Sequence, residues 1–158
     1  MGEALSSKRY LAVKMKQESV VIPLDKVLRI LTSPEITPVY LMPAHAVGVL
    51  NNRGKIIPVF DLYFFLSGKP QESTEESCVI LLEIDKELQL GVLVDEVDGI
   101  KEFNSSEEKT LPDSFDQPHH QLFKNLFHSK HQVWCELNLT QFPHLEFAKQ
   151  GEKNESVP

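Results

Sequence analysis

The sequence lacks any apolar run of the roughly 18 residues that a membrane-spanning helix needs, although 41% of its 158 residues are hydrophobic. Cysteine is scarce too. Cys78 and Cys135 are the only two, and each lies among apolar neighbours, which favours buried, reduced thiols over a disulfide framework. The N-terminal residues 1–10 lack the apolar centre of a secretory signal. We therefore expect a cytoplasmic protein with no membrane insertion.

Basic residues are in the minority. Lysine and arginine number 16 against 23 aspartates and glutamates, which gives a formal net charge of −7. Binding to a phosphate backbone depends on clusters of basic side chains that release counterions, so nucleic acid is an unfavourable partner. The acidic residues near position 75 stand among serine and threonine inside a polar stretch, residues 67–77, which is typical of a solvated connector.

Recognisable catalytic motifs are missing as well. The sequence has no glycine-rich phosphate loop, no dinucleotide fingerprint, no nucleophile elbow and no H-E-x-x-H zinc motif. Both cysteines lie in predicted strands between bulky apolar residues, which does not suit an activated nucleophile. We therefore predict a protein that is not an enzyme, with no catalytic residues and no cofactor.

A group of histidines in the second half invites a zinc site. Its members are His119, His120, His128 and His131, with Cys135 nearby. Structural zinc sites usually combine ligands in pairs, such as C-x₂-C with H-x₃₋₅-H, and this spacing does not provide them. We expect surface histidines and no metal. A metal-dependent enzyme that uses residues 119–135 is the alternative, and elemental analysis discriminates between the two.

Short β-branched and alternating segments dominate the rest of the chain. They predict antiparallel strands at residues 10–15, 20–24, 26–31, 47–50, 56–60, 78–84, 88–94, 97–100, 122–127 and 132–139. Prolines at positions 34, 38 and 43 limit regular structure there, with one helical turn expected at residues 44–47. Residues 104–120 are polar and contain proline, which predicts a long surface loop.

The two halves of the sequence resemble one another in order. A shift of 77 positions places Arg53, Ile56 and Ile57 against Lys130, Val133 and Trp134, and a shift of about 70 places Val27 and Ile30 against Val97 and Ile100. Each half is too small to bury a good core alone. We therefore expect two similar five-stranded units that close on each other as paired β-barrels, with Trp134 in a core.

A polar turn with an arginine at its apex joins two of the predicted strands. Asn51, Asn52 and Gly54 tolerate positive φ, and Arg53 is the only charge between Leu41 and Lys55. An exposed guanidinium at a hairpin tip is well placed to meet a partner's carboxylates or carbonyls. An ordinary solvated turn has the same sequence pattern, so the turn alone does not decide between the two.

The same segment resembles the signature hairpin of CheW-like domains. Residues 48–62 carry a Gly-Val, an Asn-x-Arg-Gly turn, a Pro and an Asp-Leu in the family's order. Leu-Asp-Lys-Val at residues 24–27 is similar to the family's early strand, and residues 90–97 resemble its Gly-x-x-Val-Asp-x-Val segment. Together these segments represent most of residues 10–145.

The resemblance implies an all-β fold of two intertwined five-stranded SH3-like barrels, with a short helical turn and a short C-terminal helix. It also implies one CheW-like domain at residues 10–147, with an N-terminal tail at 1–9 and a polar C-terminal tail at 148–158. The implied role is a non-enzymatic adaptor. One lobe would dock the regulatory domain of a CheA-type histidine kinase, and the inter-lobe region would bind the cytoplasmic tip of a chemoreceptor. A free-standing SH3-like module that binds peptides is the other alternative.

The resemblance also implies a set of partner-binding residues in and around the turn. They are Arg53, Asn51, Asn52, Gly54, Lys55, Val27 and Arg29. Two of them depart from the family pattern, because Arg29 stands where an acidic residue is usual and Asn52 where an apolar residue is frequent. The reversed charge at Arg29 would repel a partner's arginine or lysine, which favours a different kinase or receptor.

Overall fold

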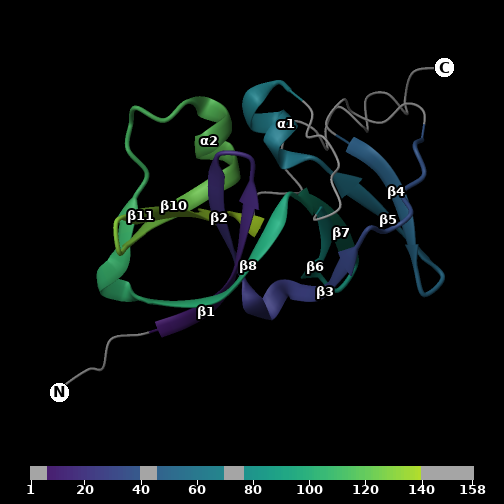
Figure 1. Ribbon diagram of the computed structural model, residues 1–158, viewed down its shortest axis with the longest axis horizontal. Coiled ribbons are helices and arrows are strands. Elements are labelled where there is room, and N and C mark those ends of the chain that lie inside the picture. The colour runs from purple at the N-terminus through teal and green to yellow at the C-terminus, as the bar shows by residue number, and fades with distance from the viewer. Residues whose placement is uncertain (1–6, 40–45, 70–76, 140–158) are drawn as a thin grey trace.

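The computed structural model describes residues 7–39, 46–69 and 77–139, and these form two sheets that lie side by side (Figure 1). The first sheet has the order β8-β1-β2-β11-β10-β9 and the second the order β3-β6-β7-β5-β4. The strands of the first sheet are β1 (Ser7–Met15), β2 (Glu18–Pro23), β8 (Glu96–Asn104), β9 (Glu108–Thr110), β10 (Phe123–Ser129) and β11 (Gln132–Leu137). Those of the second are β3 (Val27–Thr32), β4 (Ala46–Asn52), β5 (Lys55–Phe60), β6 (Cys78–Asp85) and β7 (Leu88–Val94).

The two sheets repeat one pattern of pairing. In the second sheet the hairpin β4–β5 joins the hairpin β6–β7 through a parallel pair, β5 with β7. In the first sheet the hairpin β10–β11 joins the hairpin β1–β2 through the parallel pair β11 with β2. The chain enters the first sheet, builds the whole second sheet and then returns. The expected correspondence of the two halves is confirmed at these strands.

Irregularities in pairing recur at the same offsets. The β4–β5 register shifts between Ala46 and Gly48, and the β10–β11 register shifts 77 positions later, between Phe123 and Asn125. Because an extra residue in one strand bends and twists the sheet locally, the two hairpins are bent at corresponding positions.

A central core lies between the sheets, with a smaller core inside each lobe. On β1, Leu11 and Val13 face the central cluster while Ala12 faces the cluster of the first lobe. On β6, Ile80 faces the central cluster and Leu81 the cluster of the second lobe. Successive side chains on a strand point to opposite faces. Strands buried on both faces therefore carry the continuous apolar runs that the sequence shows.

The strands of each lobe curl without closing into a complete ladder. In the second lobe β3 and β4 are opposite edges, and Thr37 bridges part of the gap with two backbone hydrogen bonds to Val49, of 2.8 and 2.9 Å. In the first lobe Phe103 of β8 stacks on Phe127 of β10 with ring centroids 4.7 Å apart. The SH3-like architecture is confirmed, with the three-residue strand β9 added to the first sheet.

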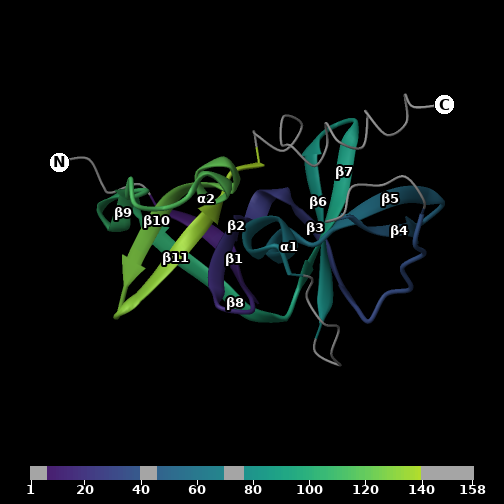
Figure 2. The ribbon, with the colours of Figure 1, turned by 90° about the horizontal axis from the view of Figure 1, so that it is seen from above.

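Two short helices lie next to each other on one side of the strands (Figures 1 and 2). The helix α1 (Leu62–Ser67) begins at Asp61, whose side chain accepts from the backbone N–H of Phe64, and ends at Gly68 with φ of 78°. The helix α2 (Gln117–Leu122) is capped by Asp116 in the same way. Such caps satisfy backbone donors that a short helix leaves unpaired. The 3₁₀ turns η1 (Leu24–Lys26) and η2 (Ser105–Glu107) precede β3 and β9.

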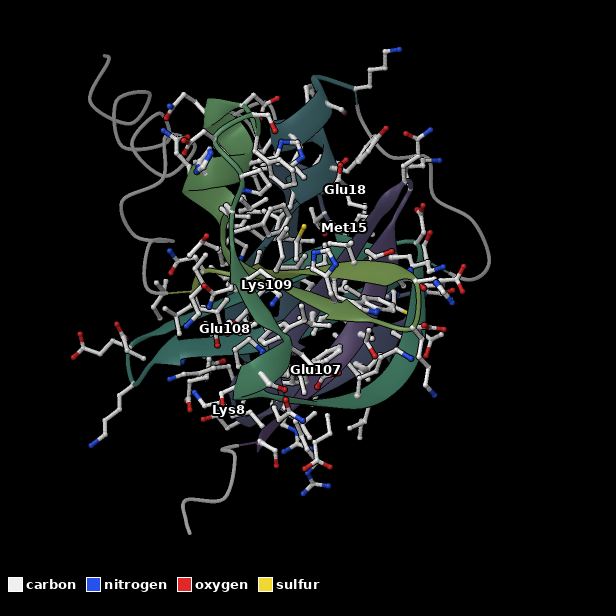
Figure 3. All side chains as sticks on the ribbon, turned by 90° about the vertical axis from the view of Figure 1, so that its left-hand side faces the viewer. Lys8, Met15, Glu18, Glu107, Glu108 and Lys109 are labelled. Carbon is white, nitrogen blue, oxygen red and sulfur yellow. The ribbon has the colours of Figure 1, made fainter. Side chains whose placement is uncertain are left out.

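Some expectations from the sequence are wrong. The helical turn expected at residues 44–47 gives way, from Ala46 on, to β4, because cross-strand pairing with β5 outweighs local helical preference. Residues 104–120 are not one loop, since they include η2, β9 and the start of α2; β9 crosses in front of the first lobe in Figure 3. The expected C-terminal helix and the tail at 148–158 lie outside the described residues.

Candidate docking site

The β4–β5 turn holds Arg53 at its tip in a left-handed conformation. Arg53 has φ of 55° and Gly54 has φ of 85°, and the turn joins the paired residues Asn52 and Lys55. Two central residues with positive φ are the requirement of a type I′ turn, which matches the twist of a hairpin. The side-chain oxygen of Asn51 accepts from the backbone N–H of Gly54 at 2.8 Å. The backbone of the tip is therefore tied to its own strand, with Arg53 exposed at the apex.

Arg29 on β3 reaches across the open edge of the lobe to the hairpin. Its Nη1 donates to Oδ1 of Asn52 at 3.0 Å. The two residues that depart from the family pattern are therefore partners of one another. Since β3 and β4 are not neighbours in the sheet, this side-chain bond connects the two edges where the backbone ladder is absent.

A hollow of 510 Å³ lies between β3 and the β4–β5 hairpin. Its lining consists of Arg29, Leu31, Pro34, Glu35, Thr37, Leu50, Asn51, Asn52 and Arg53. Three large apolar side chains are exposed on the same strands: Leu28 is 41% exposed, Ile30 44% and Ile56 62%. Exposed apolar side chains on these strands, together with two arginines in the lining of the hollow, suit a protein–protein interface, where arginine is enriched.

The structure brings together four of the predicted partner-binding residues, Arg29, Asn51, Asn52 and Arg53. Gly54 holds the turn, and Lys55 is exposed at the start of β5 without lining the hollow. Val27 packs against the central core and is only partly exposed.

Sequence reasoning missed the part of the lining that follows β3, which includes Pro34, Glu35 and Thr37. These residues are brought to the hollow by the backbone bridge between Thr37 and Val49. That bridge depends on the tertiary fold, so no local sequence pattern indicates it. Within the lining, Glu35 is the only acidic residue beside the two arginines. On a chain of net charge −7 this is a local surplus of positive charge, and it favours a partner that presents carboxylates.

The histidines of the second half do not gather at one point. Nδ1 of His119 lies 2.6 Å from Oδ1 of Asp116 and its Nε2 lies 3.3 Å from Oε2 of Glu18. His128 is exposed on β10 and His131 at the β10–β11 turn. Within residues 7–39, 46–69 and 77–139, no group of three histidine, cysteine, aspartate or glutamate side chains has the arrangement of a metal site.

Both cysteines are buried thiols, as expected. Burial raises the pKa of the Cys135 thiol to about 12 and also raises the pKa of Cys78. Since the thiolate is the nucleophile, both thiols are unreactive near neutral pH. Trp134 is 3% exposed and belongs to the core of the first lobe, which confirms its predicted place.

A protein-family model identifies the family of this chain. The family model of the CheW-like domain matches residues 9–145. The chain belongs to the CheW-like family. The match includes both lobes and the turn at Arg53, so the resemblance first drawn from the hairpin extends over the fold. No helix among the described residues is long and apolar enough to cross a membrane.

Individual relatives agree with the family. The chain is 29% identical over 100 residues to the chemotaxis protein CheW of Thermotoga maritima, a segment that is 63% of this chain and 65% of that protein. It is 29% identical over 101 residues to protein PilI of Pseudomonas aeruginosa, with 64% of this chain and 56% of that protein aligned. The aligned segments are thus less than two thirds of these relatives' lengths.

One solved structure has the same fold. The scaffolding protein TtCheW from Thermoanaerobacter tengcongensis superimposes with a TM-score of 0.75 over 84% of this chain and 90% of that one, at 20% sequence identity. The two lobes described above therefore share the fold of that protein over most of its length.

Proposed function

We propose that this CheW-like protein is a cytoplasmic, non-enzymatic adaptor that couples chemoreceptors to a CheA-type histidine kinase in chemotaxis-like two-component signalling. The observation that carries the proposal is the Arg53 hairpin. Its tip is fixed by Asn51 and by the bond between Arg29 and Asn52, and it stands beside a hollow lined by both polar and apolar residues. The family supplies the class of partner.

The geometry suits recognition of a protein surface by a preformed tip. A rigid turn loses little conformational entropy on binding, because Arg53 and Gly54 are already held in the left-handed region. Arginine at the centre of an interface, once desolvated, contributes about 2 kcal/mol or more to binding. Leu31, Pro34 and Leu50, which line the same hollow as Arg53, provide apolar contacts beside that arginine.

An adaptor role also agrees with the chemistry of the described residues. The thiols are buried with raised pKa values, and the half-buried His119 is engaged by two carboxylates. Both thiols are thus packed, and His119 is paired. Binding, without a chemical step, is the function that this surface supports.

The test measures affinity for the purified regulatory domain of a CheA-type kinase from the same organism, by isothermal titration calorimetry. We expect Arg53→Glu to weaken binding about 30-fold, the equivalent of about 2 kcal/mol. Lys130→Glu is the matched control, because Lys130 is at the tip of the β10–β11 hairpin, also with positive φ. It should change the affinity less than twofold. No binding by the wild type, or equal losses in both variants, contradicts the proposal.

The receptor contact is proposed for the inter-lobe region, on the strength of the family resemblance. Binding of a soluble chemoreceptor hairpin fragment to the Arg53→Glu variant separates the two contacts. We expect receptor binding to survive in that variant within about twofold while kinase binding falls. Loss of both at once would show that one surface serves both partners or that the variant is misfolded, and circular dichroism of the variant distinguishes these.

A further inference from the structure

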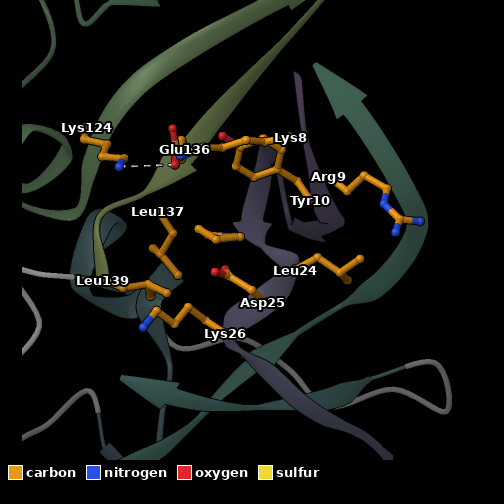
Figure 4. Close-up of a pocket in the computed structure, with 11 residues that line it drawn as sticks. Lys8, Arg9, Tyr10, Leu24, Asp25, Lys26, Lys124, Glu136, Leu137 and Leu139 are labelled. Carbon is orange, nitrogen blue, oxygen red and sulfur yellow. Dashed lines mark ion pairs between the residues drawn. The ribbon is translucent and has the colours of Figure 1, made fainter. Parts of the chain in front are cut away.

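A second hollow, of 580 Å³, lies in the first lobe away from the Arg53 hairpin (Figure 4). It is bounded by the start of β1, by η1 and by the open end of the β10–β11 hairpin. Its volume is within the range of about 300 to 1,000 Å³ that is usual for small-molecule sites. Apolar walls come from Leu24, Leu137 and Leu139.

The floor of this hollow holds a carboxylate that is already neutralised. Glu136 is 3% exposed, and its Oε2 lies 3.4 Å from Nζ of Lys124, the ion pair drawn in Figure 4. Nδ2 of Asn125 donates to its Oε1 at 3.3 Å. The buried hydroxyl of Tyr10 also bonds to it, and burial together with the Glu136 charge raises the Tyr10 pKa, so the hydroxyl keeps its proton. A carboxylate with three donors has no need of a cationic ligand.

The rim carries a surplus of positive charge. Two acidic residues, Asp25 and Glu136, also line the hollow. Because Glu136 pairs with Lys124, the three cations Lys8, Arg9 and Lys26 at the opening face the single carboxylate of Asp25. Lys8 and Arg9 are exposed and Lys26 is partly so. This surplus is notable on a chain of net charge −7. A ligand that enters must satisfy apolar walls and cationic groups at the mouth.

We propose that this hollow is a binding site for a small organic anion with an apolar body, such as an aliphatic carboxylate. The apolar body would lie against Leu24, Leu137 and Leu139, and the anionic group would lie near Lys8 and Lys26. A cation would be repelled at the mouth, and a neutral molecule would gain only the apolar part. The site is separate from the docking face, and the proposal stands without the adaptor role.

Such a ligand would also affect a contact between the two lobes. Nζ of Lys26 also donates to the backbone oxygen of Ile84 in β6 of the second sheet, at 3.5 Å, and η1 leads directly into β3. An anion that draws Lys26 into the hollow would therefore remove a contact between the lobes. Ligand binding at this site would therefore affect the start of β3, the strand that contains Arg29.

The test titrates the ¹⁵N-labelled full chain with octanoate, kept below its micelle concentration, and follows amide chemical shifts. We expect saturable shifts at residues 8–10, 24–26 and 136–139. The neutral counterpart, 1-octanol, and the cationic counterpart, octylammonium, should bind at least tenfold more weakly. Shifts spread over other faces, equal binding of octanol, or no saturable shift would overturn the proposal.

Charge-reversal variants show where the anion binds. Lys8→Glu and Lys26→Glu change side chains at the rim and should each weaken octanoate binding about tenfold. The control Lys130→Glu makes the same charge change at the closed end of the β10–β11 hairpin, away from the hollow, and should have less than a twofold effect. Equal weakening in all three variants would indicate a general effect of net charge and would contradict a defined site. The dispersion of each spectrum verifies that the variant is folded.

Discussion

The β4–β5 and β10–β11 hairpins are built alike and present different chemistry. Both have two-residue turns, between Asn52 and Lys55 in one and between Ser129 and Gln132 in the other. In each turn a basic residue and the residue after it have positive φ. They are Arg53 and Gly54 in the β4–β5 turn, and Lys130 and His131 in the β10–β11 turn. The 77-residue offset relates the two turns residue by residue.

The surroundings of the two tips differ. The first tip is joined to β3 by Arg29 and stands over a hollow. Near the second tip, Nε2 of Gln132 donates to Oγ of Ser19 at 2.9 Å, which ties that hairpin to β2 within its own sheet. Arg29 itself corresponds, at the offset of 70, to Gly99, which has no side chain to reach across. The repeated backbone therefore sets the fold, while single side chains decide which lobe can dock a partner.

The largest effect is expected from Gly48→Ala, at the irregularity that both lobes share. A Cβ at Gly48 would lie 2.3 Å from the carbonyl oxygen of Thr37, with φ of 153°. The clash is with backbone, so the Thr37–Val49 bridge must open, and we expect a loss of about 3 kcal/mol in unfolding free energy. Urea denaturation measures this loss of unfolding free energy.

The corresponding position in the first lobe, Asn125, provides the control for that experiment. Asn125→Ala removes only its hydrogen bond to Glu136 and should cost about 1 kcal/mol. Equal losses in Gly48→Ala and Asn125→Ala would contradict the view that Thr37 sets the requirement for glycine.

The second residues of the two turns should respond in opposite directions. Gly54→Ala forces a side chain into the left-handed region and should destabilise by about 1 kcal/mol, although nothing crowds the site. His131→Gly relieves the same strain and should stabilise by a few tenths of a kcal/mol after the entropy of the unfolded chain is counted. Both are measured as urea midpoints, and changes of the same sign would show that the turns are not equivalent.

A pH-dependent contact distinguishes the first lobe. Burial opposes protonation of His119, but its hydrogen bonds with Asp116 and Glu18 outweigh this and raise its pKa. Glu18 starts β2 below α2, near Met15 in Figure 3, so the imidazolium joins α2 to the β1–β2 hairpin. Only the protonated ring can donate to both carboxylates.

The sign of this dependence follows from the direction of the shift. A raised pKa stabilises the fold below the unfolded value of about 6.5, and the gain is lost as pH rises through the folded pKa. The hydrogen bond from His119 lowers the pKa of Asp116. The stability that Asp116 contributes is therefore lost as pH falls through the pKa of Asp116 in the folded protein. The melting-temperature difference between wild type and His119→Gln should shrink as pH rises from about 6 to 8. A difference independent of pH would exclude the contact.

The smallest effect concerns the bond between Arg29 and Asn52. Arg29 is exposed and Asn52 is partly exposed, so Arg29→Ala and Asn52→Ala should each lower stability by less than about 0.5 kcal/mol. A double-mutant cycle on kinase affinity should nevertheless show coupling of about 1 kcal/mol, because each residue positions the other beside Arg53. Additive effects on affinity would show that the two residues act independently.

Much of the fold could be predicted from the sequence. The hairpins follow from apolar alternation and turn residues, and the repeated order of the halves indicated paired lobes. The helix α1 was missed because its six residues follow a strand without a change in hydrophobicity; its signal is Asp61 before and Gly68 after it. The bond between Arg29 and Asn52 could not be predicted, since it joins opposite edges of a curled sheet.

The most direct test of the docking face is amide hydrogen exchange of the full chain, alone and with the kinase regulatory domain. We expect slower exchange at residues 51–55 and along β3, and unchanged exchange at Lys130 and His131. Protection confined to the β10–β11 tip, with none at Arg53, would contradict it.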